Sequence, residues 1–141
     1  MRRLLTLAAL TAALLIPTHA QAKDVTTCSF QTVQPGTWTP YENELTIRCF
    51  AREMGVDVDT ALYIARRESG MDETAWNTST DCRGLFQHLG RWWPSRVQTY
   101  GRLLARYDVK STSAFNPRTN ALVAMAMARS GWTPWTTYNG G

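Results

Sequence analysis

The chain has 141 residues, a formal net charge of +4, six tryptophans and three cysteines. This length suits one domain with a single hydrophobic core. The excess of positive charge is too small to indicate a nucleic-acid-binding protein, and no basic run with interleaved aromatic residues accompanies it.

The first 22 residues read as an export signal. Two arginines at positions 2 and 3 precede an apolar stretch, residues 4–16, and Ala20-Gln21-Ala22 supplies a small-x-small cleavage pattern. The apolar stretch is too short to span a bilayer comfortably, so we favour cleavage after Ala22, or after Ala20, over a permanent membrane anchor. The mature chain would keep 119 residues and a net charge of +2. We expect it in the periplasm or outside the cell, with no integral membrane span.

Residues 23–38 read as an irregular polar arm, and residues 39–141 as the domain proper. A first helix is predicted to begin after Thr39, which can cap it, while Glu42 can complete a capping box. Gly55 is expected to end this helix. Three apolar residues mark its buried face: Ile47, Phe50 and Met54.

A second helix is predicted to begin after Asp57, which can cap it, and to stop at Gly70. An apolar stripe runs along it at helical spacing, and Glu68 falls on this stripe one turn later. The stripe consists of Ala61, Ile64 and Ala65. A carboxyl group on an inward face is unfavourable unless it is neutral, paired or used in chemistry. Glu68 is therefore a candidate general acid, because desolvation favours the protonated form of a carboxyl group. The alternative is a surface glutamate paired with a neighbouring arginine.

Residues 71–83 are mostly polar and are predicted to form a loop. The compact apolar segment Gly84-Leu85-Phe86-Gln87 follows and is expected to be strand-like. A glycine would let the backbone approach a substrate, and the amide of Gln87 can hydrogen-bond sugar hydroxyls or an acetamido group. The alternative is a glycine turn before a buried Leu-Phe pair.

The remaining segments are predicted to be helical. We expect helices from Pro94 to about Tyr100, from Arg102 to Tyr107, and from Pro117, which Asn116 can cap. The last of these carries residues 121–128, which are apolar on every side and indicate a buried central helix. The fold class is therefore mainly α, or α+β at most. Most of the tryptophans are expected in the core, with one or two lining a cleft.

The cysteines permit one disulfide and leave one thiol over. We expect the pair Cys49–Cys82, because it would tie the first helix to the polar loop. Cys28–Cys49 is the alternative, since Cys28 lies in the arm. A metal site is not expected: the chain has no C-x-x-C motif, and the mature chain keeps one histidine, His88. His88 follows Gln87 and could touch a substrate.

Three motifs occur in a specific order: Glu68-Ser69-Gly70, then Gly84-Leu85-Phe86-Gln87, then Asn116-Pro117-Arg118-Thr119-Asn120 at a helix start. This combination resembles the soluble lytic transglycosylase and goose-type lysozyme superfamily, especially its small secreted members. The resemblance runs from about Leu45 to Trp135. Phe86 replaces the usual methionine, and Asn116 replaces an aspartate.

The resemblance implies a lysozyme-like single domain that cuts the peptidoglycan glycan strand. It places the catalytic glutamate on Glu68 and substrate-binding roles on Ser69, Gly84 and Gln87. Tyr138 corresponds to the tyrosine of the family's A-Y-N-A-G element, although it lies closer to the preceding helix than usual. No metal or organic cofactor is implied, and we expect a monomer that does not bind nucleic acid.

The implied reaction uses one acid. Protonated Glu68 would donate to the oxygen between N-acetylmuramic acid and N-acetylglucosamine, and would then take the proton of the C6 hydroxyl to leave a 1,6-anhydro ring. A hydrolase needs a second carboxylate. The available acids lie in the polar loop, where we expect solvated groups: Asp72, Glu73 and Asp81. This favours a transglycosylase. The alternatives are a hydrolase in which Asp72 or Asp81 guides water, and a non-catalytic wall-binding module.

Overall fold

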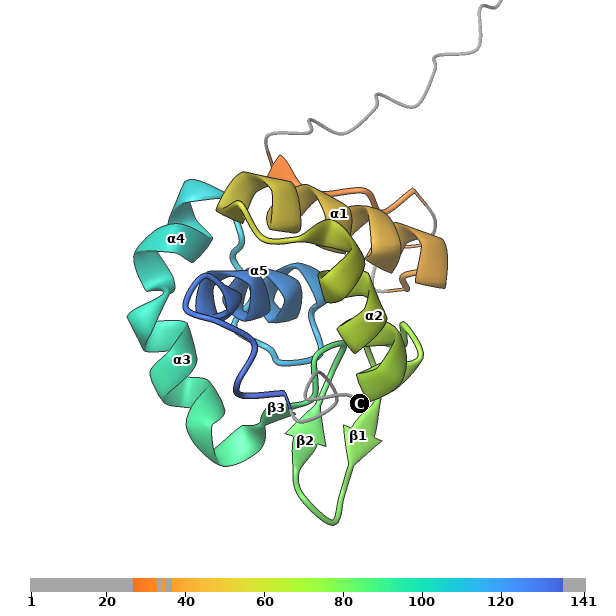
Figure 1. Cartoon of the computed structure of the whole chain (residues 1–141), viewed down its shortest axis with the longest axis vertical. Coiled ribbons are helices and arrows are strands. Elements are labelled where there is room, and N and C mark those ends of the chain that lie inside the picture. The colour runs from red at the N-terminus through yellow and green to blue at the C-terminus, as the bar shows by residue number, and fades with distance from the viewer. Residues whose placement is uncertain (1–26, 33, 35–36, 136–141) are drawn as a thin grey trace, which may run out of the picture.

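The computed structural model describes residues 27–32, 34 and 37–135. The predicted export signal and Tyr138 lie outside these residues. The described part is a small, mainly α-helical domain with one small sheet, which confirms the predicted fold class. Figure 1 shows α5 in the middle of the domain, α1 and α2 along one side, α3 and α4 along the other, and the sheet at one end.

The helices and strands follow one another in this order: α1 (Pro40–Met54), α2 (Val58–Ser69), β1 (Trp76–Asn77), β2 (Cys82–Arg83), β3 (His88–Leu89), the 3-10 helix η2 (Gly90–Trp92), α3 (Trp93–Thr99), α4 (Gly101–Arg106) and α5 (Pro117–Ala128). Both ends of α1 and of α2 agree with the sequence prediction. No helix among the described residues is both long enough and apolar enough to cross a membrane.

The predicted capping box at the start of α1 is present. The Thr39 hydroxyl accepts the Glu42 N–H at 3.2 Å, and the Glu42 carboxylate accepts the Thr39 N–H at 2.8 Å. The same carboxylate accepts the backbone N–H and the hydroxyl of Thr32. Burial alone would raise the pKa of Glu42, but these hydrogen bonds outweigh it and lower the pKa to about 2. Glu42 therefore anchors the arm on α1 as an anion.

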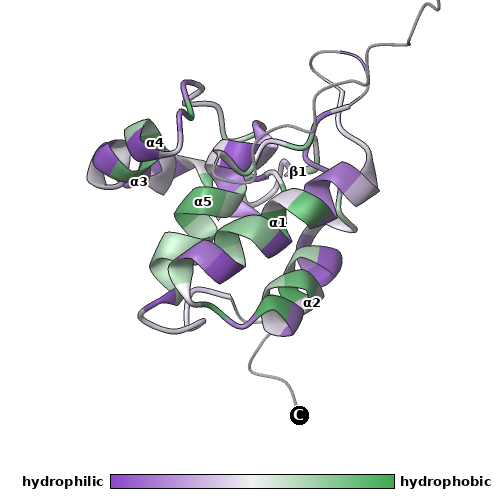
Figure 2. Cartoon of the chain, turned by 90° about the horizontal axis from the view of Figure 1, so that it is seen from above, coloured by the Kyte–Doolittle hydropathy of each residue, from purple (hydrophilic) through white to green (hydrophobic). Residues whose placement is uncertain are grey.

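α5 is the buried centre of the domain. Asn116 caps its start by accepting the Thr119 N–H at 3.1 Å, as predicted. Residues 121–125 are fully buried, and α5 packs on α1, which also packs on α2. Figure 2 shows α5 as an apolar segment, in contrast to the mixed surface of α1. The side chains of α5 thus form the core against which the other helices pack.

The sheet was not predicted. β1, β2 and β3 are antiparallel neighbours in that order, with Trp76 opposite Arg83 and Cys82 opposite Leu89. The prediction of a loop throughout residues 71–83 is wrong, because β1 and β2 lie within this range. The prediction of a strand-like segment at residues 84–87 is also wrong, because these residues form the turn between β2 and β3. Strands of two residues are too short to show the alternation of polar and apolar residues that identifies a strand.

The predicted Cys49–Cys82 disulfide is wrong. Cys28 bonds Cys49 with the two Cα atoms 5.5 Å apart, while Cys82 is a partly exposed thiol on β2. The reason is that the arm folds back on the helices instead of extending from them. Arg118 of α5 donates to the Thr27 carbonyl at 2.6 Å, which holds the residue next to Cys28 against the core.

Candidate functional site

Glu68 lies in the last turn of α2. The apolar stripe that precedes it is fully buried, as predicted, and Glu68 itself is partly buried. The next residue, Ser69, donates its hydroxyl to the Ala65 carbonyl at 3.1 Å. The hydroxyl proton of Ser69 is therefore engaged within the helix, and only its oxygen remains to accept a hydrogen bond from a substrate.

Backbone hydrogen bonds connect the end of α2 to the Gly84–Gln87 turn. The Asp72 N–H donates to the Ser69 carbonyl at 3.2 Å, and the Ala75 N–H donates to the Asp72 carbonyl at 3.3 Å. The Gly84 N–H in turn donates to the Ala75 carbonyl at 2.8 Å. The chain that leaves α2 therefore curls back and holds this turn, so that two of the sequence motifs share one hydrogen-bonded segment.

Gly84 adopts the left-handed backbone conformation, with φ of 73°. A Cβ at this position would lie 2.3 Å from the Ala114 carbonyl oxygen and 2.4 Å from Nδ2 of Asn120. No side chain fits in that space, and the conformation itself favours glycine. Packing within the protein accounts for this glycine, and its predicted approach to a substrate stays a prediction.

Asn120 fixes the turn from the side of α5. Its Nδ2 donates to the carbonyls of Ala114 at 2.7 Å and Arg83 at 3.1 Å, and its Oδ1 accepts the Phe86 N–H at 2.9 Å. Asn120 is the last residue of the third sequence motif, to which sequence reasoning assigned no separate role. The signal for its role was an asparagine on an otherwise apolar helix, because a buried side-chain amide requires hydrogen-bond partners.

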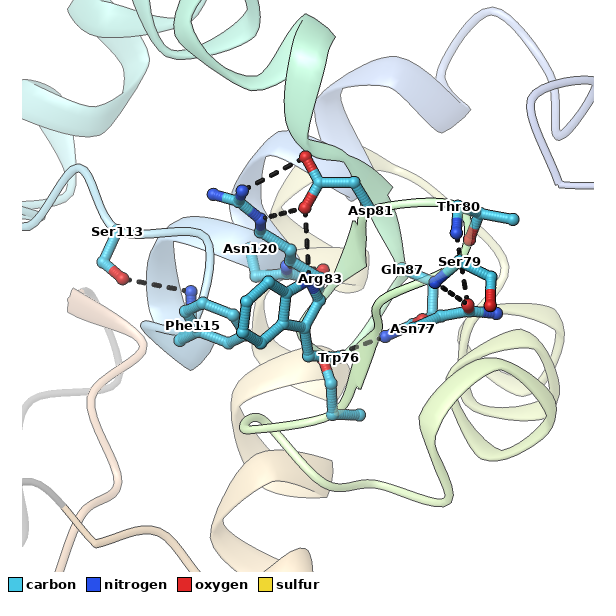
Figure 3. Close-up of polar contacts among 11 residues, drawn as sticks. Trp76, Asn77, Ser79, Thr80, Asp81, Arg83, Gln87, Ser113, Phe115 and Asn120 are labelled. Carbon is cyan, nitrogen blue, oxygen red and sulfur yellow. Dashed lines mark hydrogen bonds and ion pairs between the residues drawn. The ribbon is translucent and has the colours of Figure 1, made fainter.

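Gln87 also has a left-handed backbone, with φ of 45°. Its Nε2 donates to the carbonyls of Ala75 at 3.1 Å and Gly84 at 3.0 Å. Figure 3 shows Gln87 beside β1. Within the described part of the chain, no hydrogen bond reaches its Oε1. Because both amide protons are engaged, Gln87 can meet a substrate only as an acceptor, for example of a sugar hydroxyl or an acetamido N–H. A non-glycine residue held in this conformation is typical of functional positions.

His88 is buried. It is 1% exposed, with Nε2 3.2 Å from the Asn120 carbonyl oxygen and Nδ1 2.8 Å from Nη1 of Arg96. Burial, followed by the charge of Arg96, lowers the pKa of His88 to about 3. The imidazole is thus neutral and structural, and it packs against the rings of Trp93 and Trp135.

The acids of the 71–83 segment are each engaged by neighbours. Asp72 accepts the N–H and hydroxyl of Thr74 at 2.8 and 2.6 Å. Glu73 is buried, contrary to the prediction of a solvated group, and accepts the Asn43 amide at 2.7 Å and the Trp38 N–H at 3.2 Å. Glu73 therefore ties this segment to α1 and is a structural residue.

Asp81 pairs with Arg83, whose Nε donates to it at 2.7 Å and whose Nη2 donates at 3.1 Å (Figure 3). Trp76 Nε1 adds a third hydrogen bond at 3.1 Å. The hydrogen bond from Arg83, above all, lowers the pKa of Asp81. Each of the three acids of this segment thus accepts hydrogen bonds from neighbouring residues of the protein.

The tryptophans divide between core and surface. Trp93, Trp132 and Trp135 are buried, and Trp135 donates its indole N–H to the Phe86 carbonyl at 2.8 Å. Trp76 and Trp92 are exposed. A hollow of about 370 Å³ between α3, α4 and residues 108–112 is lined by none of the predicted site residues. The described residues contain no group of three or more His, Cys, Asp or Glu side chains that could hold a metal ion.

Comparisons with protein-family models, with curated proteins and with solved structures found no match. Functional assignment therefore depends on the residues and their geometry. The structure brings Ser69, Gly84 and Gln87 onto one hydrogen-bonded segment at the end of the helix that carries Glu68. Tyr138 lies outside the described residues, and Cys82 belongs to no disulfide.

Proposed function

We propose that the protein is a peptidoglycan-cleaving lytic transglycosylase with Glu68 as its acid and base. The substrate is the glycan strand, and the bond cut is the β-1,4 link between N-acetylmuramic acid and N-acetylglucosamine. The reaction leaves 1,6-anhydro ends. The protein acts as a monomer without metal or organic cofactor, in the periplasm or at the cell wall.

One observation carries the proposal: the helix whose last turn carries a partly buried carboxyl group is connected by backbone hydrogen bonds to a turn with an amide oxygen that accepts no hydrogen bond in the described part of the chain. Glu68 supplies the carboxyl group and Gln87 the oxygen. Partial burial leaves the Glu68 carboxyl group accessible to a substrate, as a general acid requires. A strained backbone at Gln87 supports a role in orienting a ligand.

The proposed reaction needs no second acid. Glu68 donates its proton to the glycosidic oxygen while the acetamido group of the muramic acid stabilises the positive charge that develops at C1. The resulting Glu68 carboxylate removes the proton of the C6 hydroxyl, whose oxygen bonds to C1. The proton count of Glu68 is restored, and no water is consumed.

A hydrolase of the same fold is the alternative within this chemistry. Asp72 and Asp81 are the acids that could guide water in such an enzyme. Oδ1 of Asp72 accepts two hydrogen bonds from Thr74, and both oxygens of Asp81 accept hydrogen bonds from Arg83. This arrangement favours the transglycosylase.

The change Glu68→Gln tests the enzyme proposal. It keeps the shape of the side chain and removes the transferable proton, so the rate of clearing of a cell-wall suspension should fall at least about 100-fold. Asp59→Asn is the matched control, because it converts an exposed carboxylate at the other end of α2 to an amide. Asp59→Asn should clear at the wild-type rate.

Equal clearing by Glu68→Gln and the wild type would contradict the assignment of Glu68. Absence of clearing by the wild type, together with sedimentation of the protein with cell walls, would instead support the non-catalytic binding module. Both variants should unfold at the same temperature as the wild type, so that a difference in clearing reflects the chemical step and not a loss of folded protein.

A further inference from the structure

Trp76 is an exposed aromatic side chain that the protein holds in place. It is 57% exposed, yet its indole N–H donates to Oδ1 of Asp81 at 3.1 Å. The guanidinium carbon of Arg83 lies 5.7 Å from the centre of the ring, and Phe115 meets the indole in a T-shaped contact at 6.3 Å. These contacts, drawn in Figure 3, restrict the ring without covering it.

The Asp81–Arg83 pair packs closely against Gly90. A Cβ at Gly90 would lie 2.1 Å from Oδ2 of Asp81 and 3.0 Å from the guanidinium carbon of Arg83. The Gly90 N–H also donates to the Asp81 carbonyl at 2.7 Å. Asp81 and Arg83, which hold the Trp76 indole, are therefore themselves fixed by close packing against Gly90. This distinguishes Trp76 from an exposed tryptophan whose ring makes no such contacts.

Trp76 directly follows Ala75, the residue whose carbonyl accepts the side-chain amide of Gln87. The same carbonyl accepts the Gly84 N–H. The backbone that carries the indole is thus continuous with the backbone that holds the proposed substrate-binding turn.

We propose that Trp76 forms an additional subsite on which a sugar ring of the glycan strand stacks, outside the bond that is cut. This inference rests on the proposed function. The C–H groups on a pyranose face are apolar and pack on an aromatic ring, while its hydroxyl and acetamido groups point outward. A preorganised ring loses little conformational entropy on binding, which favours affinity.

The surroundings of the indole favour a sugar over a protein partner. The apolar surface is small, the indole with the edge of Phe115, and the hydrogen-bonding side chains of Asp81 and Arg83 border it (Figure 3). Asp81 engages Nε and Nη2 of Arg83, and Nη1 makes no hydrogen bond within the described residues. Nη1 can donate to an acetamido carbonyl or to a carboxylate on the peptide-bearing sugar.

Binding of chitohexaose to the Glu68→Gln protein tests the subsite, because that background prevents turnover. The indole N–H signal of Trp76 should shift on titration in ¹⁵N-resolved NMR. Trp76→Ala in the same background should weaken the dissociation constant roughly three- to tenfold, as loss of one aromatic stack predicts. Trp92→Ala is the matched control: Trp92 is 52% exposed and also has an arginine over its ring, but none of the residues that the structure describes hydrogen-bonds its indole nitrogen. It should change the constant less than twofold.

Three results would overturn the subsite: an unchanged dissociation constant in Trp76→Ala, an equal loss in both tryptophan variants, or no response of the Trp76 signal to the sugar. The test is separable from the proposed function. If the wild type cleaves glycan while Trp76→Ala binds normally, the subsite fails alone. If Trp76 binds sugar but the wild type cleaves nothing, the transglycosylase proposal fails alone.

Discussion

The side-chain amide of Asn120 occupies the space beside Gly84 that a β-carbon would need. An ideal Cβ on Gly84 would lie 2.4 Å from Nδ2 of Asn120, which itself donates to the Ala114 carbonyl at 2.7 Å. Two motifs therefore meet in one contact, between residues that are 36 positions apart in the sequence. Their joint occurrence has a structural explanation, since each restricts the residue type of the other.

Gly84→Ala should destabilise the protein by about 3 kcal/mol. The new methyl group would overlap a carbonyl oxygen and the Asn120 amide, and alanine is strained at a positive φ. Denaturant unfolding measures the difference. Gly101→Ala is the control, because a Cβ there meets nothing within 4 Å. Equal stability of the two variants would contradict the packing account.

Asn120→Asp should lower the free energy of unfolding by about 3 kcal/mol. The substitution replaces an N–H donor by an oxygen that faces two carbonyl oxygens at a buried position. Asn116→Asp is the matched change at the start of the same helix, and it should be nearly neutral because the Asn116 side chain uses its Oδ1 to accept from Thr119, and aspartate caps equally well. Similar losses of unfolding free energy in Asn120→Asp and Asn116→Asp would contradict the proposed difference between the two asparagines.

Removal of the Cys28–Cys49 disulfide should reduce stability by about 3 kcal/mol, because the bond closes a chain separation of 21 residues. Cys49→Ser tests this by thermal or denaturant unfolding. Cys82→Ser should leave stability nearly unchanged, since Cys82 is a free thiol. One reactive thiol in the native wild type and none in Cys82→Ser would agree with the pairing. A disulfide that disappears in Cys82→Ser would contradict it.

Stability should fall with acidification below about pH 6.5 because of His88. The unfolded chain takes up a proton on this imidazole as the pH falls through 6.5, whereas the folded protein does so only near its lowered pKa of about 3. The contribution of His88 to the free energy of unfolding is therefore complete above pH 6.5. It is lost as the pH falls towards 3, at up to about 1.4 kcal/mol per pH unit. Glu42 adds a further loss of stability only below pH 4.5, as the pH approaches its pKa of about 2.

Unfolding measured between pH 6.5 and 4.5 isolates the histidine. His88→Gln removes the titrating group, so the slope of stability against pH in this interval should flatten, even if the variant is less stable overall. An unchanged slope would show that another group titrates in this range.

The helices could be predicted from the sequence because local signals at their ends are strong. Thr39 and Glu42 form the expected capping box, and Gly55 ends α1 with φ of 66°. The sheet escaped prediction because its register depends on side-chain bonds within the turn, such as those of Asn77 to the N–H groups of Ser79 and Thr80. The disulfide depends on the path of the arm, which no local pattern records.

The site was only partly accessible to sequence reasoning. Glu68 and Gln87 were singled out by periodicity and by motif, and the structure adds that the amide protons of Gln87 are already engaged. Trp76 was one tryptophan among six until its hydrogen bond to Asp81 and its exposure distinguished it. Such features depend on contacts between segments, so composition and spacing do not reveal them.

Mass spectrometry of peptidoglycan digested by the wild-type protein tests the central claim most directly. If Glu68 alone serves as acid and base, every new muramic acid end should carry a 1,6-anhydro ring and be lighter by one water than a reducing end. Fragments with reducing ends, or a digest indistinguishable from that of the Glu68→Gln protein, would contradict the account.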